Sequence, residues 1–187
     1  MLAAAAIPHA VWPVDIDETP RVGERPESLV ARLSQEKADA AAKLCAPGSP
    51  ILAADTIVTV AGAILGKPPH EGAARQMLTL LSGKTHSVLT GYHLRYVDAD
   101  GQISRQSRVV STTVTIQPLT DGDIAGYLRS EEWRGKAGAY AIQGRFSAFV
   151  RGIEGSYDNV VGLPLCAVIE DLRSLGLLPS DWPNWTP

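Results

Sequence analysis

Asp55 is the residue whose position most strongly indicates chemistry. It is the only charged residue within 50–60, a run rich in Ile, Val and Thr that is typical of a buried strand. Because an unpaired carboxylate is costly to bury, Asp55 must be paired, hydrogen-bonded or bound to a metal ion. An aspartate that only caps a neighbouring loop would explain an isolated case, but the apolar residues on both sides favour a functional role.

Three other charged residues could bind phosphate or a metal ion. Lys37 falls on the apolar face of a helix predicted over 26–44, so its ammonium either reaches water or points into a cleft. Glu18 belongs to an acidic loop that could bind Mg²⁺, although a solvated loop would have the same composition. Lys67 lies between a glycine and a proline, which either present it to a phosphate or form a plain turn.

Two later segments could contact a ligand through their backbone. The small residues of 136–144 would allow a close approach, and the Gln143 amide could read a base edge because it both donates and accepts hydrogen bonds. The segment 156–164 leads into the last predicted helix, whose N-terminus could face an anion. Tight turns without a ligand would look the same in both places.

Several common functional classes are excluded or unsupported. Residues 83–85 read Gly-Lys-Thr, but Leu78 occupies the place of the earlier glycine that a phosphate-binding P-loop requires. The four histidines lack zinc-type spacing, no G-x-S-x-G elbow occurs, and two cysteines cannot build a disulfide framework. A net charge of -3 argues against a protein that coats a nucleic acid polymer.

The apolar patterns predict one α/β domain over residues 1–187, with 179–187 as an extension. Helices are expected at 26–44, 71–81, from Thr120 onward and at 165–175, and strands at 11–16, 50–60, 63–65, 85–97, 103–117 and 146–153, with a hairpin turn at 98–101. No run approaches the roughly 18 apolar residues of a membrane span, and the apolar start is too short for a signal peptide. We therefore expect a cytoplasmic protein that binds no membrane.

In order, these segments closely resemble the Maf family of nucleoside triphosphate pyrophosphatases. The resemblance spans residues 15–165 and is carried by 17–19, 32–38, 54–58, 66–68, 81–86, 136–140, 142–144 and 159–164. It implies a two-lobed α/β fold like that of inosine triphosphatase, with a mixed sheet flanked by helices around a central cleft. It also links the protein to septum formation and, together with the Trp-rich tail, predicts a homodimer.

The resemblance implies hydrolysis of a nucleoside triphosphate, with dTTP, UTP or modified nucleotides as substrates, to the monophosphate and pyrophosphate, assisted by Mg²⁺, Mn²⁺ or Co²⁺. Such an activity would serve as a house-cleaning reaction. Asp55 then matches the proton acceptor or a metal ligand. The other implied site residues are Glu18 as a metal ligand, Lys37, Lys67 and Lys136 as phosphate or substrate contacts, and Thr56 and Gln143, which match the subfamily that prefers dTTP and UTP. Attack at the α-phosphorus needs a positioned water, cations over the phosphates and a carboxylate, and these residues provide that set.

The start of the chain departs from the family pattern. Family members open with a strand and a Ser-x-Ser-Pro-Arg-Arg loop that grips phosphate, whereas Met1 aligns with the helix that should follow. We expect that Met1 is an internal methionine or that the chain is truncated. The alternative function is a non-catalytic protein that binds nucleotides or regulates division and has lost the loop.

Overall fold

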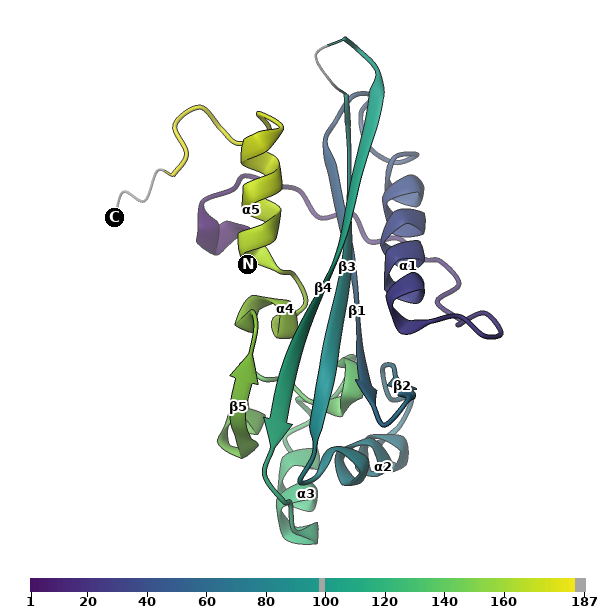
Figure 1. The fold of residues 1–187 in the computed structure, drawn as a ribbon, viewed down its shortest axis with the longest axis vertical. Helices are drawn as coiled ribbons and strands as arrows, with labels where there is room; N and C mark the ends of the chain where they lie inside the picture. The colour runs from purple at the N-terminus through teal and green to yellow at the C-terminus, as the bar shows by residue number, and fades with distance from the viewer. Residues whose placement is uncertain (98–99, 184–187) are drawn as a thin grey trace.

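The computed structural model describes residues 1–97 and 100–183. Its backbone is an antiparallel sheet with the strand order β2-β1-β3-β4-β5 (Figure 1). The strands β1 (Ile51–Val60), β3 (Thr85–Val97) and β4 (Ile103–Ile116) run through most of the molecule. The short strands β2 (Ala63–Leu65) and β5 (Val150–Glu154) lie at the two edges of the lower part. The long strands therefore connect two lobes that bury separate sets of side chains.

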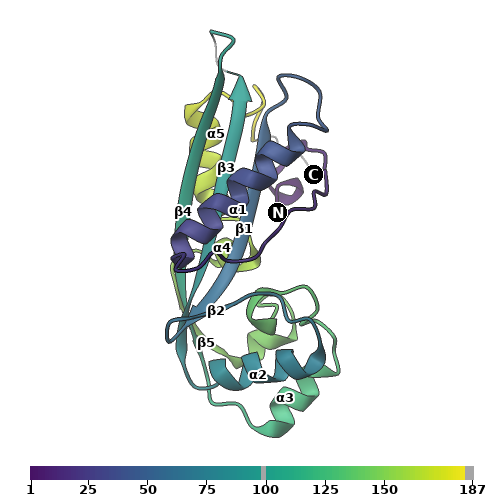
Figure 2. The same cartoon turned by 90° about the vertical axis from the view of Figure 1, so that its right-hand side faces the viewer.

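The helices cover both faces of this sheet. In the upper lobe, α1 (Pro26–Ala41) and α5 (Leu165–Ser174) lie on opposite faces (Figure 2). The lower lobe contains α2 (Glu71–Leu81) and α3 (Asp121–Leu128), and the short α4 (Tyr157–Val161) lies between the lobes in Figure 1. Short 3₁₀ turns occupy Ala3–Ala5, Ala137–Ala139 and Arg145–Phe149. Within the described residues, no helix has the length and apolar content needed to cross a bilayer.

Close packing of α1 against the sheet depends on Gly91 in β3. A Cβ atom at this position would collide with the carbonyl oxygen of Val30 in α1. Gly91 is the register partner of Asp55 in β1. The glycine therefore lets α1 lie directly over the part of the sheet that contains Asp55.

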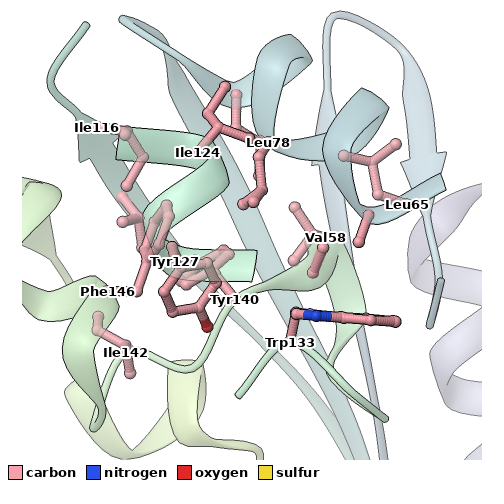
Figure 3. Close-up of a cluster of buried hydrophobic side chains, with 14 of the residues drawn as sticks. Val58, Leu65, Leu78, Ile116, Ile124, Tyr127, Trp133, Tyr140, Ile142 and Phe146 are labelled. Atoms are coloured by element: carbon pink, nitrogen blue, oxygen red, sulfur yellow. The ribbon is translucent and has the colours of Figure 1, made fainter. Parts of the chain in front are cut away.

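The largest core cluster fills the lower lobe (Figure 3). It joins the ends of the long strands to α2, α3 and the segment that follows α3. The side chains labelled in Figure 3 are Val58, Leu65, Leu78, Ile116, Ile124, Tyr127, Trp133, Tyr140, Ile142 and Phe146. Smaller clusters lie between α1 and the sheet and between α5 and the sheet. Most helical stability here comes from such packing of one apolar face.

The predicted α/β fold with a helix-flanked sheet is confirmed. All strand pairings among the described residues are antiparallel, so the sheet is not mixed in strand direction. The helix predicted at 71–81 matches α2, and Thr120 forms the predicted capping box of α3. In the predicted hairpin turn, residues 98–99 lie outside the described part of the chain.

Two predicted strands are wrong in place or extent. Residues 11–16 form no strand: Pro13 cannot donate a ladder hydrogen bond, and Val11 is 77% exposed. The strand predicted at 146–153 begins only at Val150, because the preceding 3₁₀ turn buries Phe146 in the lower core. Helix α1 ends at Ala41, and the following Leu44 is 54% exposed.

Candidate active site

A cleft of about 220 Å³ opens beside β1 between the two lobes. Six of the seven predicted site residues line this cleft: Lys37, Asp55, Thr56, Lys67, Lys136 and Gln143. The seventh, Glu18, lines an adjoining hollow of about 210 Å³ that shares Asp55, Thr56 and Lys67 with the cleft. The fold thus brings together all seven residues from five separate parts of the chain.

The unpaired edge of β1 explains how neighbouring residues on opposite faces reach one cavity. In the described sheet, β2 pairs only with residues 58–60 of β1. Successive side chains of a strand point to opposite faces, so Asp55 turns toward α1 and Thr56 turns away from it. Both line the cleft because the cleft passes along the edge that β2 leaves open.

Four charged side chains alternate in sign at the α1 side of the cleft. Lys37 Nζ lies 2.5 Å from Asp55 Oδ1 and 2.7 Å from Glu18 Oε1. Lys67 Nζ lies 3.1 Å from Glu18 Oε2. Only 16% of the Lys37 side chain and 7% of the Asp55 side chain are exposed. Helical spacing leaves open whether the Lys37 ammonium reaches water or points into a cleft. The structure shows it inside the cleft.

These contacts favour the charged forms of Lys37 and Glu18. Burial by itself lowers the pKa of Lys37, but its hydrogen bonds with Asp55 and Glu18 outweigh burial, so the pKa is raised above the usual value. The pKa of Glu18 is lowered, first by its hydrogen bond with Lys37 and also by Lys67. Groups in a cleft whose pKa values are shifted by burial and by specific charged partners are candidates for a functional site.

The segment 135–143 forms the lower wall of the cleft and carries Lys136 and Gln143. Gly138 has a φ of 67°, and a Cβ there would lie 2.9 Å from a Val58 methyl group. Its N–H donates to the Gly66 carbonyl at 3.1 Å, beside Lys67. From the sequence, the small residues of this segment are predicted to allow a close approach to a ligand. At Gly138 the close approach is instead toward β1 and the loop that carries Lys67. It holds Lys67 and Lys136 on adjoining segments.

Two buried rings support the same wall. Tyr140 Oη lies 2.8 Å from His86 Nε2, and Tyr127 Oη accepts a hydrogen bond from the Ala141 N–H at 3.0 Å. Burial lowers the pKa of His86 to about 4 and raises the pKa of Tyr140. The His86 ring and the Tyr140 hydroxyl are therefore both neutral at neutral pH. Figure 3 shows Tyr140 and Tyr127 packed near Phe146 in the lower core.

Hydroxyl and amide groups connect Thr56 to α4. Thr56 Oγ1 lies 2.8 Å from Thr90 Oγ1, its direct partner in β3, and Thr90 donates to the Asn159 carbonyl at 3.1 Å. The Asn159 amide donates to the carbonyl of Val88 and to Thr112 Oγ1. Residues 160–162, which follow Asn159, line the cleft, whereas the N-terminus of α5 does not. The sequence analysis missed Thr90, although a threonine in a buried apolar strand was a usable signal.

The acidic residues present fit a divalent cation only in combination with a ligand. Among the described residues, His, Cys, Asp and Glu side chains form no group of three or more that could hold a metal ion. Glu18 and Asp55 form a pair bridged by one ammonium. Mg²⁺ is commonly bound by one or two carboxylates together with substrate phosphates and water, so two carboxylates are a sufficient protein contribution.

The fold is that of an α/β protein with a helix-flanked antiparallel sheet and a charged cleft along the open edge of that sheet. Comparison with known sequences defines the family. The family model described as "Maf-like protein" matches residues 1–175. The chain belongs to the Maf family.

Curated relatives are similar over nearly the whole chain. A dTTP/UTP pyrophosphatase of Geobacter sulfurreducens is 45% identical over 178 residues, which cover 95% of this chain and 91% of the relative. A protein of the same name from Rhizobium etli is 46% identical over 183 residues, with 95% and 87% covered. A third, from Myxococcus xanthus, is 45% identical over 182 residues, with 97% and 89% covered.

Proposed function

We propose that this protein hydrolyses nucleoside triphosphates, with dTTP and UTP as preferred substrates, to the monophosphate and pyrophosphate. The observation that carries the proposal is a buried carboxylate, Asp55, in a cleft that also contains Lys37, Lys67 and Lys136. Relatives of about 45% identity that are named dTTP/UTP pyrophosphatase support the same reaction.

The cleft lining combines the two kinds of group that a nucleotide requires. The end near α1 carries the alternating charges and suits a triphosphate, because ammonium groups neutralise phosphate as point charges. The rest of the lining combines apolar side chains with the polar groups of Thr56 and Gln143. The apolar residues there are Val58, Val88, Tyr140, Val160 and Val161. A flat base with polar edges fits such a lining.

In the reaction that we propose, a water oxygen attacks the α-phosphorus. The bond from that phosphorus to the oxygen bridging to the β-phosphorus breaks, and pyrophosphate leaves. Asp55 takes the proton of the attacking water, and the lysines stabilise the charge that develops on the phosphate oxygens. Lys37 contacts both Asp55 and Glu18, so it also orients the two carboxylates.

We further propose that Glu18 and Asp55 hold a divalent cation together with the triphosphate. Such a cation would act as a Lewis acid that polarises the phosphoryl oxygens. The support is the chemistry of the two carboxylates and their place beside the lysines. The test of this part is whether hydrolysis requires Mg²⁺, Mn²⁺ or Co²⁺ after treatment with a chelator.

Product analysis tests the proposed function. The protein is incubated with UTP, dTTP, CTP and GTP and each divalent cation, and the products are separated by anion exchange. We expect UMP and pyrophosphate from UTP, with UTP and dTTP hydrolysed faster than GTP. Formation of UDP and phosphate would contradict the proposal. Nucleotide binding without hydrolysis would favour the alternative of a non-catalytic family member.

A further inference from the structure

We propose that Thr90 and the backbone of α4 fix the Thr56 hydroxyl as a hydrogen-bond acceptor toward the cleft, so that it selects bases with an N–H at ring position 3. Uracil and thymine carry that N–H, whereas cytosine has an acceptor nitrogen in the same place. Thr90 then acts as a positioning residue, since it works through Thr56. This inference rests on the proposed function and names the group that distinguishes its substrates.

The protons of the two hydroxyls can be assigned from their partners. The Asn159 carbonyl can only accept, so the 3.1 Å contact from Thr90 Oγ1 uses the Thr90 proton. The 2.8 Å contact between the two hydroxyl oxygens needs a proton between them, and the Thr56 hydroxyl then supplies it. In this arrangement Thr56 has no proton left for a ligand, and only its lone pairs are free.

The other arrangements do not favour a donor at Thr56. If Thr90 donates to Thr56 instead, the Thr56 proton has the Gly162 carbonyl at 3.4 Å as its protein partner. Donation from Thr56 into the cleft would require Thr90 to donate to Thr56 to keep the 2.8 Å contact. Among the described residues, the Asn159 carbonyl would then keep only the Gly162 N–H as a donor. Thr90 and Asn159 are each 0% exposed, so no bulk water replaces the lost contact to Asn159. The structure therefore favours the acceptor state of Thr56.

Gln143 cannot make this distinction by itself. It is exposed in the cleft and has no hydrogen-bond partner within residues 1–97 and 100–183. Its amide can turn to present either its carbonyl or its NH₂ group, so it serves the oxygen of uracil and the amino group of cytosine equally well. The Thr56 hydroxyl is held by Thr90 and Gly162 and lacks that freedom.

The test compares UTP with CTP in the wild type, in Thr90→Val and in Thr90→Ser. Valine keeps the shape of the side chain but removes the acceptor, so the Thr56 hydroxyl can turn and donate to cytosine. We expect the ratio of kcat/KM for UTP to that for CTP to fall roughly three- to tenfold, as one hydrogen bond allows. The fall should come mainly from a lower KM for CTP. The serine variant keeps the hydroxyl and should restore the wild-type ratio.

A purely structural role for Thr90 gives a different result, because a loosened site lowers kcat/KM for both substrates and leaves their ratio unchanged. That outcome, or a wild type that hydrolyses UTP and CTP equally well, would overturn the inference while the proposed function stands.

If the valine variant does not fold, calorimetric binding of α,β-methylene UTP and CTP to the wild type decides. We expect at least threefold tighter binding of the UTP analogue; equal binding would overturn the inference. A wild type without any hydrolysis would instead overturn the proposed function, and the binding ratio would still test Thr56.

Discussion

Asp55 and Asp171 are both buried aspartates with a cationic partner, yet they lie in different surroundings. Asp55 is 7% exposed and shares the Lys37 ammonium with Glu18 at the edge of the cleft. Asp171 is 0% exposed and lies on α5, on the opposite face of the sheet from α1. It accepts a hydrogen bond of 2.6 Å from the Tyr92 hydroxyl and forms an ion pair with Arg108 that lacks hydrogen-bond alignment.

The comparison shows that burial of a carboxylate does not by itself indicate a catalytic group. Asp171 joins α5 to β3 and β4 and lines neither of the two hollows at the active site. Asp55 is less buried, but it faces a cavity. Both aspartates share their cation with a second carboxylate, since Arg108 also lies 3.7 Å from Glu170 Oε2. Access to a cavity is therefore the better indication of chemistry.

The largest effect is expected from Asp55→Asn. An amide cannot accept the proton of the attacking water, so kcat/KM for UTP should fall by about a hundredfold to ten-thousandfold. Pyrophosphate release at saturating divalent cation measures the change, and circular dichroism checks the fold. Asp171→Asn is the matched control and should leave kcat/KM within about threefold. Equal losses in the two variants would remove the distinction between the carboxylates.

The next effect concerns His86, a polar group buried behind the cleft wall. Its pKa is about 4 in the folded protein against 6.5 when unfolded, because burial disfavours the charged ring. The unfolded chain therefore binds a proton first as the pH falls, so stability is full above pH 6.5 and is lost toward pH 4. Each pKa unit is worth about 1.4 kcal/mol, and we expect a loss of about 3 kcal/mol from this group.

Urea unfolding between pH 4 and pH 7 measures the contribution of His86. The variant His86→Gln cannot titrate, so its free energy of unfolding should depend less steeply on pH than that of the wild type. Identical slopes for the two proteins would show that His86 does not bind protons differently in the folded and unfolded states.

The smallest effect is expected for the stability of Asp171→Asn. This change removes the charge that pairs with Arg108 but leaves an oxygen that can accept from Tyr92. Hydrogen bonds to charged groups contribute about 1.5–3 kcal/mol against about 0.5–1.5 kcal/mol for neutral ones, so the weakened Tyr92 bond and the lost ion pair should together lower the free energy of unfolding by about 1–2 kcal/mol. Urea denaturation at pH 7 measures it. An unchanged stability would mean that Asp171 does not join α5 to the sheet energetically.

The sequence predicted the residues whose charge or backbone chemistry conflicts with their local pattern. Asp55 interrupts an apolar strand, and Lys37 falls on the apolar face of a helix. The contact between Thr90 and Asn159 could not be predicted in this way, because it joins positions 69 residues apart and involves an uncharged hydroxyl and a backbone carbonyl. Asp171 lies beside Glu170 and looks like part of a solvated helix face until α5 packs on Tyr92.

Hydrolysis of UTP in water enriched in oxygen-18 tests the central claim most directly. If Asp55 activates a water that attacks the α-phosphorus, mass spectrometry will find one oxygen-18 atom in the phosphate of UMP and none in pyrophosphate. Label in pyrophosphate would show attack at the β-phosphorus. Label in inorganic phosphate released with UDP would show attack at the γ-phosphorus. Either of these two results would contradict the proposed role of the Asp55 cleft.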